Sequence, residues 1–370
     1  MTSVTTPATT KAVWADLLSI RPEAGPGDRL LISDPRTRRR SFVDAETLAD
    51  LLLAEETGTA APVAAGRLRD ALTQRGWLGT ADQGETSTER KWLDRQWHPS
   101  LEYYLWSRRP DFADTFDADG SVRTGLVEGY LSDGPPDSFA EQPRGDVTLP
   151  APRALPAGLP LTSVLLARRS TRSFTAAPTT VQDLSDILWH AFDDVRRVRA
   201  IPVTGPLDYF RSHGSAFDFY TVVYGVGDIP PGVYRYHLAA HQLDLVTPGE
   251  HREEMVQTIL GMRGPYTAAC TVSIIVDFPR YQWRYRHERA LRHLYMAAGR
   301  LGQRLIIVGE SLGLGTLPTP ATRDRRFAAL HRLDERRQAP MYTFTMGRVQ
   351  DRRRPATSGP AGPVSSDRSV

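Results

Sequence analysis

The chain has 370 residues, 40% of them hydrophobic, and its 46 basic and 43 acidic residues leave a formal net charge of only +3. This length and composition allow more than one buried core, and the near-balance of charge disfavours nucleic acid as a partner. The single cysteine, Cys270, excludes an internal disulfide and most cysteine-based metal sites, and its apolar surroundings predict a core position. We find neither a run of roughly 20 apolar residues for a membrane span nor a signal region, and we expect a globular cytoplasmic protein without metal.

The first half of the chain predicts a loose start followed by a small α/β module. Residues 1–25 are polar and interrupted by prolines, so we expect them to be loose. Residues 29–34 and 39–43 predict a short hairpin, and residues 45–53 and 64–75 predict two helices, the second ended by glycine. This order resembles the small winged-helix elements that bind peptides for peptide-modifying enzymes.

Other interpretations of this module stay open. A nonspecific α/β cap or a dimerisation segment has the same order of elements, and the run Arg38-Arg39-Arg40 is compatible with a DNA-binding wing. An aromatic-rich segment at 102–116 follows, and aromatic density is typical of packing. We therefore assign residues 26–131 to a winged-helix-like recognition module together with an aromatic helical segment.

Proline and glycine then mark the boundaries of the second half. Residues 132–160 are rich in both, which predicts a linker, and residues 351–370 form a polar tail that we expect to be disordered. A second domain is therefore expected at 161–350.

That domain opens with a run of residues suited to a phosphate. Leu-Leu-Ala-Arg-Arg-Ser-Thr-Arg-Ser-Phe, at 165–174, places Arg168, Arg169, Ser170 and Arg172 where their side chains could hold a dianion. Seven runs of adjacent arginines occur in the chain, so a double arginine alone is weak evidence. We expect most of these runs, including Arg196 in a neighbouring pair, to be solvated surface.

The elements that follow have clear local patterns. Thr-Val-Gln-Asp at 180–183 predicts a capping box before a helix, and the periodicity of 289–312 predicts a long buried helix with small residues near its middle. Strands are predicted at 219–226, 271–278 and 342–348, and a hairpin at 230–243. Leu-Gly-Leu-Gly-Thr-Leu-Pro at 312–318 predicts a glycine-rich turn.

The phosphate-type run resembles the Arg-Arg-Ser-x-Arg-x-Phe opening of the nitroreductase superfamily. Pro-Pro-Gly-Val-Tyr-Arg-Tyr at 230–236, followed by His-Gln-Leu at 241–243, is similar to the azoline dehydrogenase branch, which oxidises thiazolines and oxazolines during maturation of ribosomal peptides. The resemblance covers about residues 98–350. It implies an α+β fold with a central antiparallel sheet flanked by helices, and a homodimer formed through the long helix, with Ala298 and Gly302 on its small-residue face.

The same resemblance implies FMN as cofactor. Its phosphate would contact Arg168, Arg169, Ser170, Arg172 and Arg348. The flavin ring would pass Gly313 and Gly315, and Ser212 and Gly214 would border it, although Ser-His-Gly-Ser-Ala at 212–216 matches the family's Pro-Ser-Ala-Gly only loosely.

The chain departs from the family at the catalytic base. The family uses a Lys-Tyr pair just before the long helix, whereas this chain has Arg284-Tyr285-Arg286-His287 there. Lys11 and Lys91 are the only lysines in the sequence, and an arginine cannot easily accept a proton. Either Tyr285, helped by neighbouring cations, or His287 could replace the lysine; otherwise Tyr285 is a packed ring, His287 faces solvent and the family activity is absent.

The leading functional prediction is an FMN-dependent dehydrogenase that converts azolines to azoles in a peptide natural-product precursor. Its expected partners are a second copy of itself, a peptide substrate or leader peptide held by the N-terminal module, and a cyclodehydratase. Two alternatives remain: a catalytically reduced paralogue that serves as a scaffold for a peptide or partner enzyme, and a small-molecule flavin reductase that uses NAD(P)H.

Overall fold

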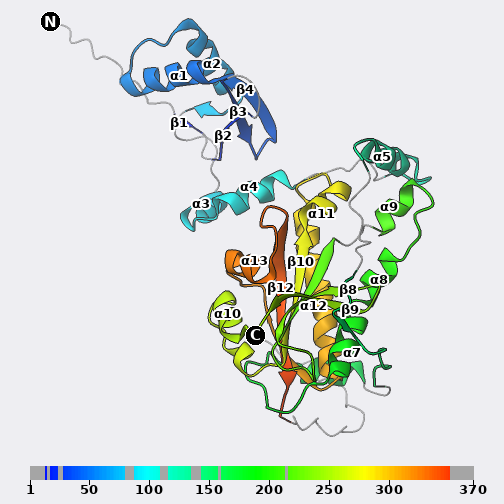
Figure 1. Ribbon diagram of the computed structural model, residues 1–370. Coiled ribbons are helices and arrows are strands. Elements are labelled where there is room, and N and C mark those ends of the chain that lie inside the picture. Colours follow the sequence, from blue (N-terminus) through cyan, green and yellow to red (C-terminus); the bar gives the residue numbers. More distant parts are fainter. Residues whose placement is uncertain are drawn as a thin grey trace, which may run out of the picture. The chain divides into compact units, whose positions relative to one another are not determined.

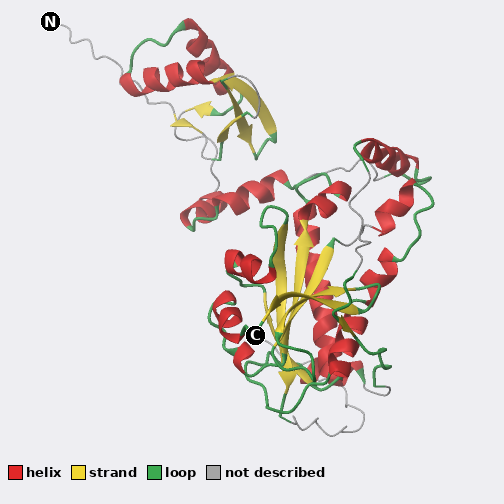
Figure 2. Cartoon of the chain, in the orientation of Figure 1, coloured by secondary structure: helices red, strands yellow, loops and turns green. Residues whose placement is uncertain are grey.

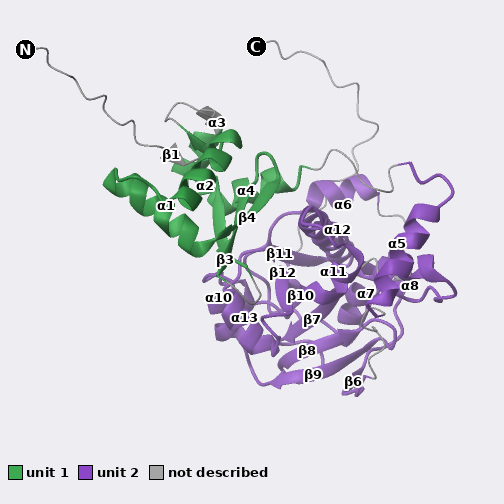
Figure 3. Ribbon diagram, turned by 90° about the horizontal axis from the view of Figure 1, so that it is seen from above, with its two compact units in different colours: residues 1–112 green, residues 113–370 purple. Residues whose placement is uncertain are grey.

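A computed structural model describes residues 13–14, 17–23, 28–79, 87–108, 116–134, 143–156, 160–212 and 216–350 (Figure 1). The chain divides into two compact units, Met1–Phe112 and Ala113–Val370 (Figure 3). The helix α5 (Ser121–Ser132) belongs to the second unit, where Tyr130 packs against Phe210 and Trp283. The unit boundary therefore precedes α5, about twenty residues before the end of the recognition module expected from the sequence. No described helix is both long and apolar enough to cross a membrane.

The first unit contains a three-stranded antiparallel sheet followed by helices. The sequence predicts two of these strands and the first two helices, but the third strand, Ser19–Pro22, lies in the stretch 1–25 that we expected to be loose, so that expectation is wrong for these four residues. The sheet order is β2-β3-β4. Its elements are β1 (Val13–Trp14), β2 (Ser19–Pro22), β3 (Arg29–Asp34), β4 (Arg39–Asp44), α1 (Ala45–Thr57), α2 (Val63–Gln74), β5 (Leu78–Gly79), α3 (Ser87–Asp94) and α4 (His98–Trp106). The helix α1 begins where the Asp44 carboxylate accepts from the Thr47 backbone N–H at 2.9 Å, and it ends at Gly58 with a left-handed φ of 69°.

Helices cover both faces of this small sheet. Ile32 and Val43 point into a core that α1 and α2 complete with Leu51 and Leu72. On the opposite face, α4 is tied to the strands by an Arg21–Glu102 ion pair of 2.8 Å and by Arg40, whose guanidinium lies 4.8 Å from the Trp106 ring centroid. Both the hairpin and the two helices expected from the sequence are confirmed.

The second unit is built on one seven-stranded sheet, in which all neighbouring strands are antiparallel (Figure 2). Its order is β11-β12-β10-β7-β8-β9-β6. The strands are β6 (Val147–Thr148), β7 (Phe217–Val223), β8 (Gly232–His237), β9 (Gln242–Pro248), β10 (Cys270–Asp277), β11 (Leu314–Thr319) and β12 (Gln338–Arg348). This arrangement confirms the expected α+β class. Most of the expected glycine-rich turn at 312–318 belongs to strand β11. The turn itself is confined to Gly313, which has a left-handed φ of 74°.

Two sets of helices cover the sheet. The helices are α6 (Leu161–Ala167), α7 (Val181–Ala191), α8 (Asp193–Arg199), α9 (Pro206–Ser212), α10 (Arg252–Thr258), α11 (Phe278–Arg284), α12 (Ala290–Ser311) and α13 (Asp324–His331), with a 3-10 turn at Gly264–Tyr266. Because side chains alternate along a strand, Phe219 of β7 packs with α7 and α12, whereas the next residue, Tyr220, packs with α10 and α13. Cys270 is buried in the first of these cores, as expected, and burial raises the pKa of its thiol to about 12.

The small residues of α12 face the sheet of their own chain. A Cβ at Gly302 would lie 2.5 Å from the Phe344 ring and 3.1 Å from Tyr342, both on β12, and Ala298 is buried in the same core. The exposed residues of this helix include Tyr295 and Met296. Our expectation that Ala298 and Gly302 form a contact between subunits is therefore wrong: they allow α12 to approach β12.

Part of the expected linker is built into the second unit. The strand β6 pairs with β9, and the carboxylate of Asp244 accepts from the backbone N–H groups of Arg144 and Gly145 at 3.0 and 2.9 Å. Further along, the Arg153 guanidinium bonds to the buried Asp186. Residues 143–156 are thus fixed along the sheet edge and α7, although their proline and glycine content suggested a free connection.

A buried chain of hydrogen bonds joins this segment to the sheet. Arg196 donates to the Tyr236 hydroxyl at 3.0 Å, and this hydroxyl lies 2.7 Å from Nδ1 of His241. On the other side of the ring, Nε2 of His241 lies 2.8 Å from the Ser185 hydroxyl. Ser185 in turn donates to the Pro150 carbonyl at 2.6 Å. Ser185 donates its one proton to Pro150, so Nε2 of His241 donates to Ser185, and a neutral His241 then accepts at Nδ1 from Tyr236. Desolvation, followed by the charge of Arg196, lowers the pKa of His241 to about 4. Arg196 is therefore a structural residue, and our expectation of a solvated side chain is wrong.

Candidate functional site

The arginine-rich segment that follows α6 lies against the ends of β11 and β12. The Thr171 N–H donates to the Thr316 carbonyl at 2.8 Å, and Ser170 forms an isolated parallel bridge with Thr316. Four residues later, the Thr175 N–H donates to the Arg348 carbonyl at 2.8 Å. Two motifs that are about 140 residues apart in the sequence, the arginine run and the glycine-rich segment, therefore meet in the fold.

Glycine makes this close approach possible. A Cβ at Gly315 would lie 2.7 Å from Oγ1 of Thr171 and even closer to the Val349 side chain. A Cβ at Gly347 would lie 3.0 Å from the ring of Phe174, which is buried in the core beside α10 and α13. The docking of residues 168–175 thus depends on the absence of side chains at two positions of the neighbouring strands.

This docking leaves a set of polar side chains available, which we call the cradle: Arg168, Ser170 and Arg172. The buried Thr171 points toward β11, and side chains alternate along an extended segment, so Ser170 and Arg172 point away from the sheet. Within the described part of the chain, the three cradle side chains form no hydrogen bond or ion pair. Arg169 differs, because its guanidinium folds back onto the carbonyls of Leu166 and Arg168 at 2.9 and 3.0 Å.

Arg348 lies beside the cradle but is already paired. Its guanidinium donates to the Asp183 carboxylate at 2.6 Å and to the Leu312 carbonyl at 3.0 Å. Asp183 is also the last residue of the expected capping box, which is confirmed, because its carboxylate accepts from the Thr180 N–H at 2.9 Å. The start of α7 therefore fixes the Arg348 side chain next to the end of α12.

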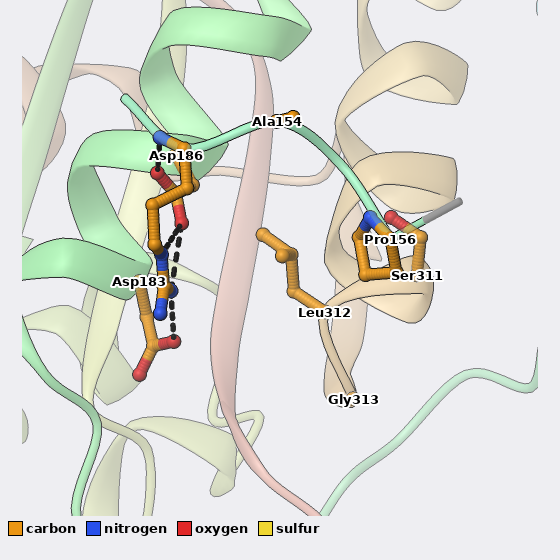
Figure 4. A pocket seen from close by; sticks show the side chains of 8 residues that line it. Ala154, Pro156, Asp183, Asp186, Ser311, Leu312 and Gly313 are labelled. Atoms are coloured by element: carbon orange, nitrogen blue, oxygen red, sulfur yellow. Dashed lines mark hydrogen bonds and ion pairs between the residues drawn. The ribbon is translucent and has the colours of Figure 1, made fainter. Parts of the chain in front are cut away.

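An open hollow of about 380 Å³ adjoins this ion pair. Figure 4 shows Asp183 and Asp186 of α7 on one side of it, and Ser311, Leu312 and Gly313 at the end of α12 on the other. Arg153 crosses the acidic side and binds Asp186 at 2.8 Å. Gly313 thus lines this hollow, and a Cβ at Gly313 would lie 3.7 Å from the Arg348 guanidinium. No group of residues in the described ranges has the composition of a metal site.

The residues expected to supply a base lie at the junction of α11 and α12. The Tyr285 ring is 4.7 Å from the Tyr281 ring and 5.4 Å from that of His293, and the Arg284 guanidinium lies 4.8 Å from its centroid. The Tyr285 hydroxyl forms no hydrogen bond with any residue that the structure describes. His287 makes an edge contact with the Tyr285 ring at 6.4 Å. Tyr285 is therefore both a packed ring and an available hydroxyl.

Sequence reasoning missed two members of this group, Tyr281 and His293. The Tyr281 hydroxyl lies 2.9 Å from Nδ1 of His293 and donates to the Ala290 carbonyl at 2.9 Å. Of the two residues expected to border the flavin, Ser212 ends α9 with only its backbone described, and Gly214 lies outside the described residues. The predicted flavin contacts of these two residues stay untested.

The cradle and the Tyr285 group lie at opposite ends of the second unit. The cradle segment bonds to Thr316, five residues after the end of α12, and to Arg348, the last residue of β12, whereas Tyr285 lies five residues before the start of α12. A helix of 22 residues is about 33 Å long, since each residue adds about 1.5 Å. The candidate phosphate site and the candidate base of one chain are separated by this distance.

Residues 165–348 match the nitroreductase family. This part of the chain belongs to that family. The match begins three residues before the cradle and ends at Arg348, so both ends of the helix and the whole sheet from β7 to β12 fall within the family region. The resemblance noted from the sequence is thereby confirmed.

One relative matches beyond the nitroreductase region. The trifolitoxin operon protein TfxC of Rhizobium leguminosarum bv. trifolii is 27% identical over 317 residues, which cover 82% of this chain and 85% of TfxC. That share exceeds the whole second unit, so the similarity extends into the first unit. MJ1384 of Methanocaldococcus jannaschii is 26% identical over 190 residues, 51% of this chain and 90% of that protein.

Solved structures show weaker likeness. A chain of the Escherichia coli microcin synthetase McbBCD complex, crystallised with truncated pro-MccB17 bound, aligns with a TM-score of 0.41 and 15% identity. The alignment covers 73% of this chain and 100% of that chain.

Proposed function

We propose that this nitroreductase-family protein is an FMN-dependent dehydrogenase that oxidises azolines to azoles in a peptide natural-product precursor. The observation that supports it most is the cradle, where the side chains of two arginines and a serine have no hydrogen bond or ion pair with any described residue, on a segment that is hydrogen-bonded to β11. The similarity to TfxC, which extends into the first unit, supports a role in peptide maturation.

The cradle fits the phosphate of FMN. Arg168 and Arg172 offer planar donor forks, and the Ser170 hydroxyl adds a shorter donor, which together suit one terminal dianion. Arg348 can contribute less, because three of its five N–H groups already donate to Asp183, Leu312 and, at 3.4 Å, Pro178. Bound FMN would supply the hydride acceptor that an azoline oxidation needs.

A homodimer would explain how the cradle and the Tyr285 group, which are far apart in one chain, could act on the same flavin. The cradle and the Tyr285 group are separated by the length of α12, about 33 Å, which FMN cannot span. A second chain related by a two-fold axis could place the start of its α12 beside the end of α12 in the first chain. Two helices paired across such an axis can run antiparallel. Exposed Tyr295 and Met296 on α12, with Leu165 and Leu166 on α6, offer the apolar surface for this contact.

We assign peptide binding to the first unit. Its strand β4 is an edge strand, and edge strands offer unpaired backbone groups to an extended peptide. Arg39 and Arg40 on that strand would favour an acidic leader peptide. A cyclodehydratase is the partner that would make the azoline. The buried, single Cys270 agrees with a cytoplasmic location.

Two observations favour the scaffold as a second candidate. The second unit contains no lysine, and Arg348 is committed to Asp183. A scaffold would bind a peptide through the first unit and have no use for an open cradle. The enzyme needs both the peptide-binding unit and the cradle.

Anaerobic mixing with a synthetic peptide that contains one thiazoline tests the proposal. The FMN-loaded protein is expected to lose its flavin colour as the ring becomes a thiazole, detected as a mass decrease of two hydrogens. A peptide that binds tightly without bleaching the flavin would favour the scaffold. An FMN-loaded protein that instead consumes NADPH with a nitro compound, and ignores the peptide, would favour a small-molecule reductase.

A further inference from the structure

His293, on the first turn of α12, has the geometry of a base prepared for proton abstraction. The Tyr281 hydroxyl donates its one proton to the Ala290 carbonyl, so it can only accept at the 2.9 Å contact with His293. Nδ1 of His293 must therefore hold a proton. The neutral imidazole then has Nε2 unprotonated, and this nitrogen forms no hydrogen bond with any described residue.

The charges around His293 keep it in this form. The side chain is exposed, yet partial desolvation and the nearby guanidinium groups of Arg284 and Arg300 lower its pKa. The Tyr281 hydroxyl and the rings of Tyr281 and Tyr285 also contact His293, and His287 makes an edge contact with the Tyr285 ring. Cations next to an imidazole oppose its protonation, so His293 is neutral and able to accept a proton at neutral pH.

We propose that Nε2 of His293 accepts the substrate proton in place of the lysine that the chain lacks. This inference rests on the proposed function. In that oxidation, one ring carbon loses a proton to Nε2 and its neighbour loses a hydride to the flavin. The electron pair left by the proton becomes the new carbon–carbon double bond. Arg284 cannot take this role, because a guanidinium stays protonated. Tyr281 acts as a positioning residue, since its hydroxyl selects the tautomer of His293.

The first test needs no substrate. We would label the full chain with ¹⁵N-histidine and assign the His293 signals by their loss in His293→Asn. At neutral pH, Nδ1 is expected to show an attached proton and Nε2 none. Tyr281→Phe removes the acceptor for Nδ1 and is expected to move the proton toward Nε2. A wild-type His293 protonated at Nε2 rather than Nδ1 would overturn the inference.

The second test measures anaerobic flavin bleaching by the thiazoline peptide. His293→Asn keeps a donor for Tyr281 but removes the base, so the bleaching rate is expected to fall about 10²- to 10⁴-fold with unchanged FMN content. Added imidazole is expected to restore part of the rate in His293→Ala. Arg197→Ala, at an exposed arginine on α8, serves as a control that keeps the wild-type rate.

The outcomes separate the two claims. A wild-type protein that bleaches, together with a His293→Asn variant that bleaches equally fast, overturns the role of His293 and leaves the proposed function standing. A wild-type protein that no thiazoline peptide bleaches overturns the proposed function, and the role of His293 with it. Dithionite should reduce the flavin equally in all variants, which shows that each is correctly loaded.

Discussion

The two ends of α12 differ in how their side chains are held. At the end near Gly313, backbone hydrogen bonds and glycine contacts fix a segment whose Arg168 and Arg172 side chains form no hydrogen bond or ion pair with any described residue. At the start of the helix, side chains hold one another, because Tyr281, Tyr285 and His293 form a packed group joined by hydrogen bonding. Ligand binding at the first end should therefore depend on backbone fit and charge, and chemistry at the second on single protons.

The largest effect is expected from a substitution that disturbs the packing of residues 168–175 against β11 and β12. Gly315→Val would place side-chain atoms against Thr171 and Val349, and we expect a loss of about 3 kcal/mol in the free energy of unfolding together with loss of FMN binding. Gly129→Val is the control, because a Cβ at this exposed position on α5 meets nothing within 4 Å. Chemical denaturation and flavin content measure both. Equal stability of the two variants would show that residues 168–175 do not depend on Gly315.

Charge at the cradle should have the next largest effect. Arg168→Ala is expected to weaken FMN about 10- to 100-fold, since a charge-assisted hydrogen bond contributes about 1.5–3 kcal/mol. Arg197→Ala is the matched control, as its side chain is 72% exposed and pairs with Asp193 at the surface. Fluorescence titration gives both dissociation constants. If Arg197→Ala weakened FMN as much as Arg168→Ala, the cradle would be assigned to the wrong arginines.

Acid should destabilise the second unit through its buried histidines. The folded pKa values of His241 and His331 are about 4 and 3, mainly because burial disfavours the imidazolium, whereas an unfolded histidine titrates near 6.5. Between these values the unfolded chain binds more protons, so stability is complete above about pH 6.5 and falls as pH decreases toward 4. Urea unfolding at several pH values would show this slope. His241→Gln should flatten it, and an identical slope in that variant would contradict the neutral relay from Arg196 to Pro150.

The smallest effect is expected at Tyr285. Its hydroxyl has no hydrogen-bond partner in the described part of the chain, so Tyr285→Phe keeps the ring contacts with Tyr281 and His293. If His293 is the base, the rate of flavin bleaching should change little. A fall of about 10²- to 10⁴-fold, the range for a lost general base, would return that role to Tyr285. His287→Ala would be compared in the same assay.

Local patterns predicted much of the fold. The capping box at Thr180, the periodicity of α12 and the hairpin of the first unit are signals within a few neighbouring residues, and all three appear in the structure. The expected linker was harder to predict. The Pro and Gly content of 143–156 indicates an irregular backbone, but it does not reveal the hydrogen bonds of this segment to Asp244 and Asp186.

The candidate site divides in the same way. The arginine run was visible in the sequence, whereas the pairing of Arg348 with Asp183 depends on a contact across 165 residues. Residue type alone misled us at Arg196 and Gly302. An arginine in a double-arginine run proved to be a partly buried member of a hydrogen-bond relay, and a small residue on a helix faced the sheet of its own chain. His293 had no sequence signal, because its value as a base comes from one hydrogen bond to Tyr281.

The central claim is that the cradle of Arg168, Ser170 and Arg172 holds the phosphate of FMN. The most direct measurement is a pair of fluorescence titrations of the full chain with FMN and with riboflavin, which has the same ring but no phosphate. The account predicts that FMN binds at least about tenfold more tightly, and that Arg168→Ala removes most of this difference. Equal affinity for the two flavins, or no binding of either, would contradict it.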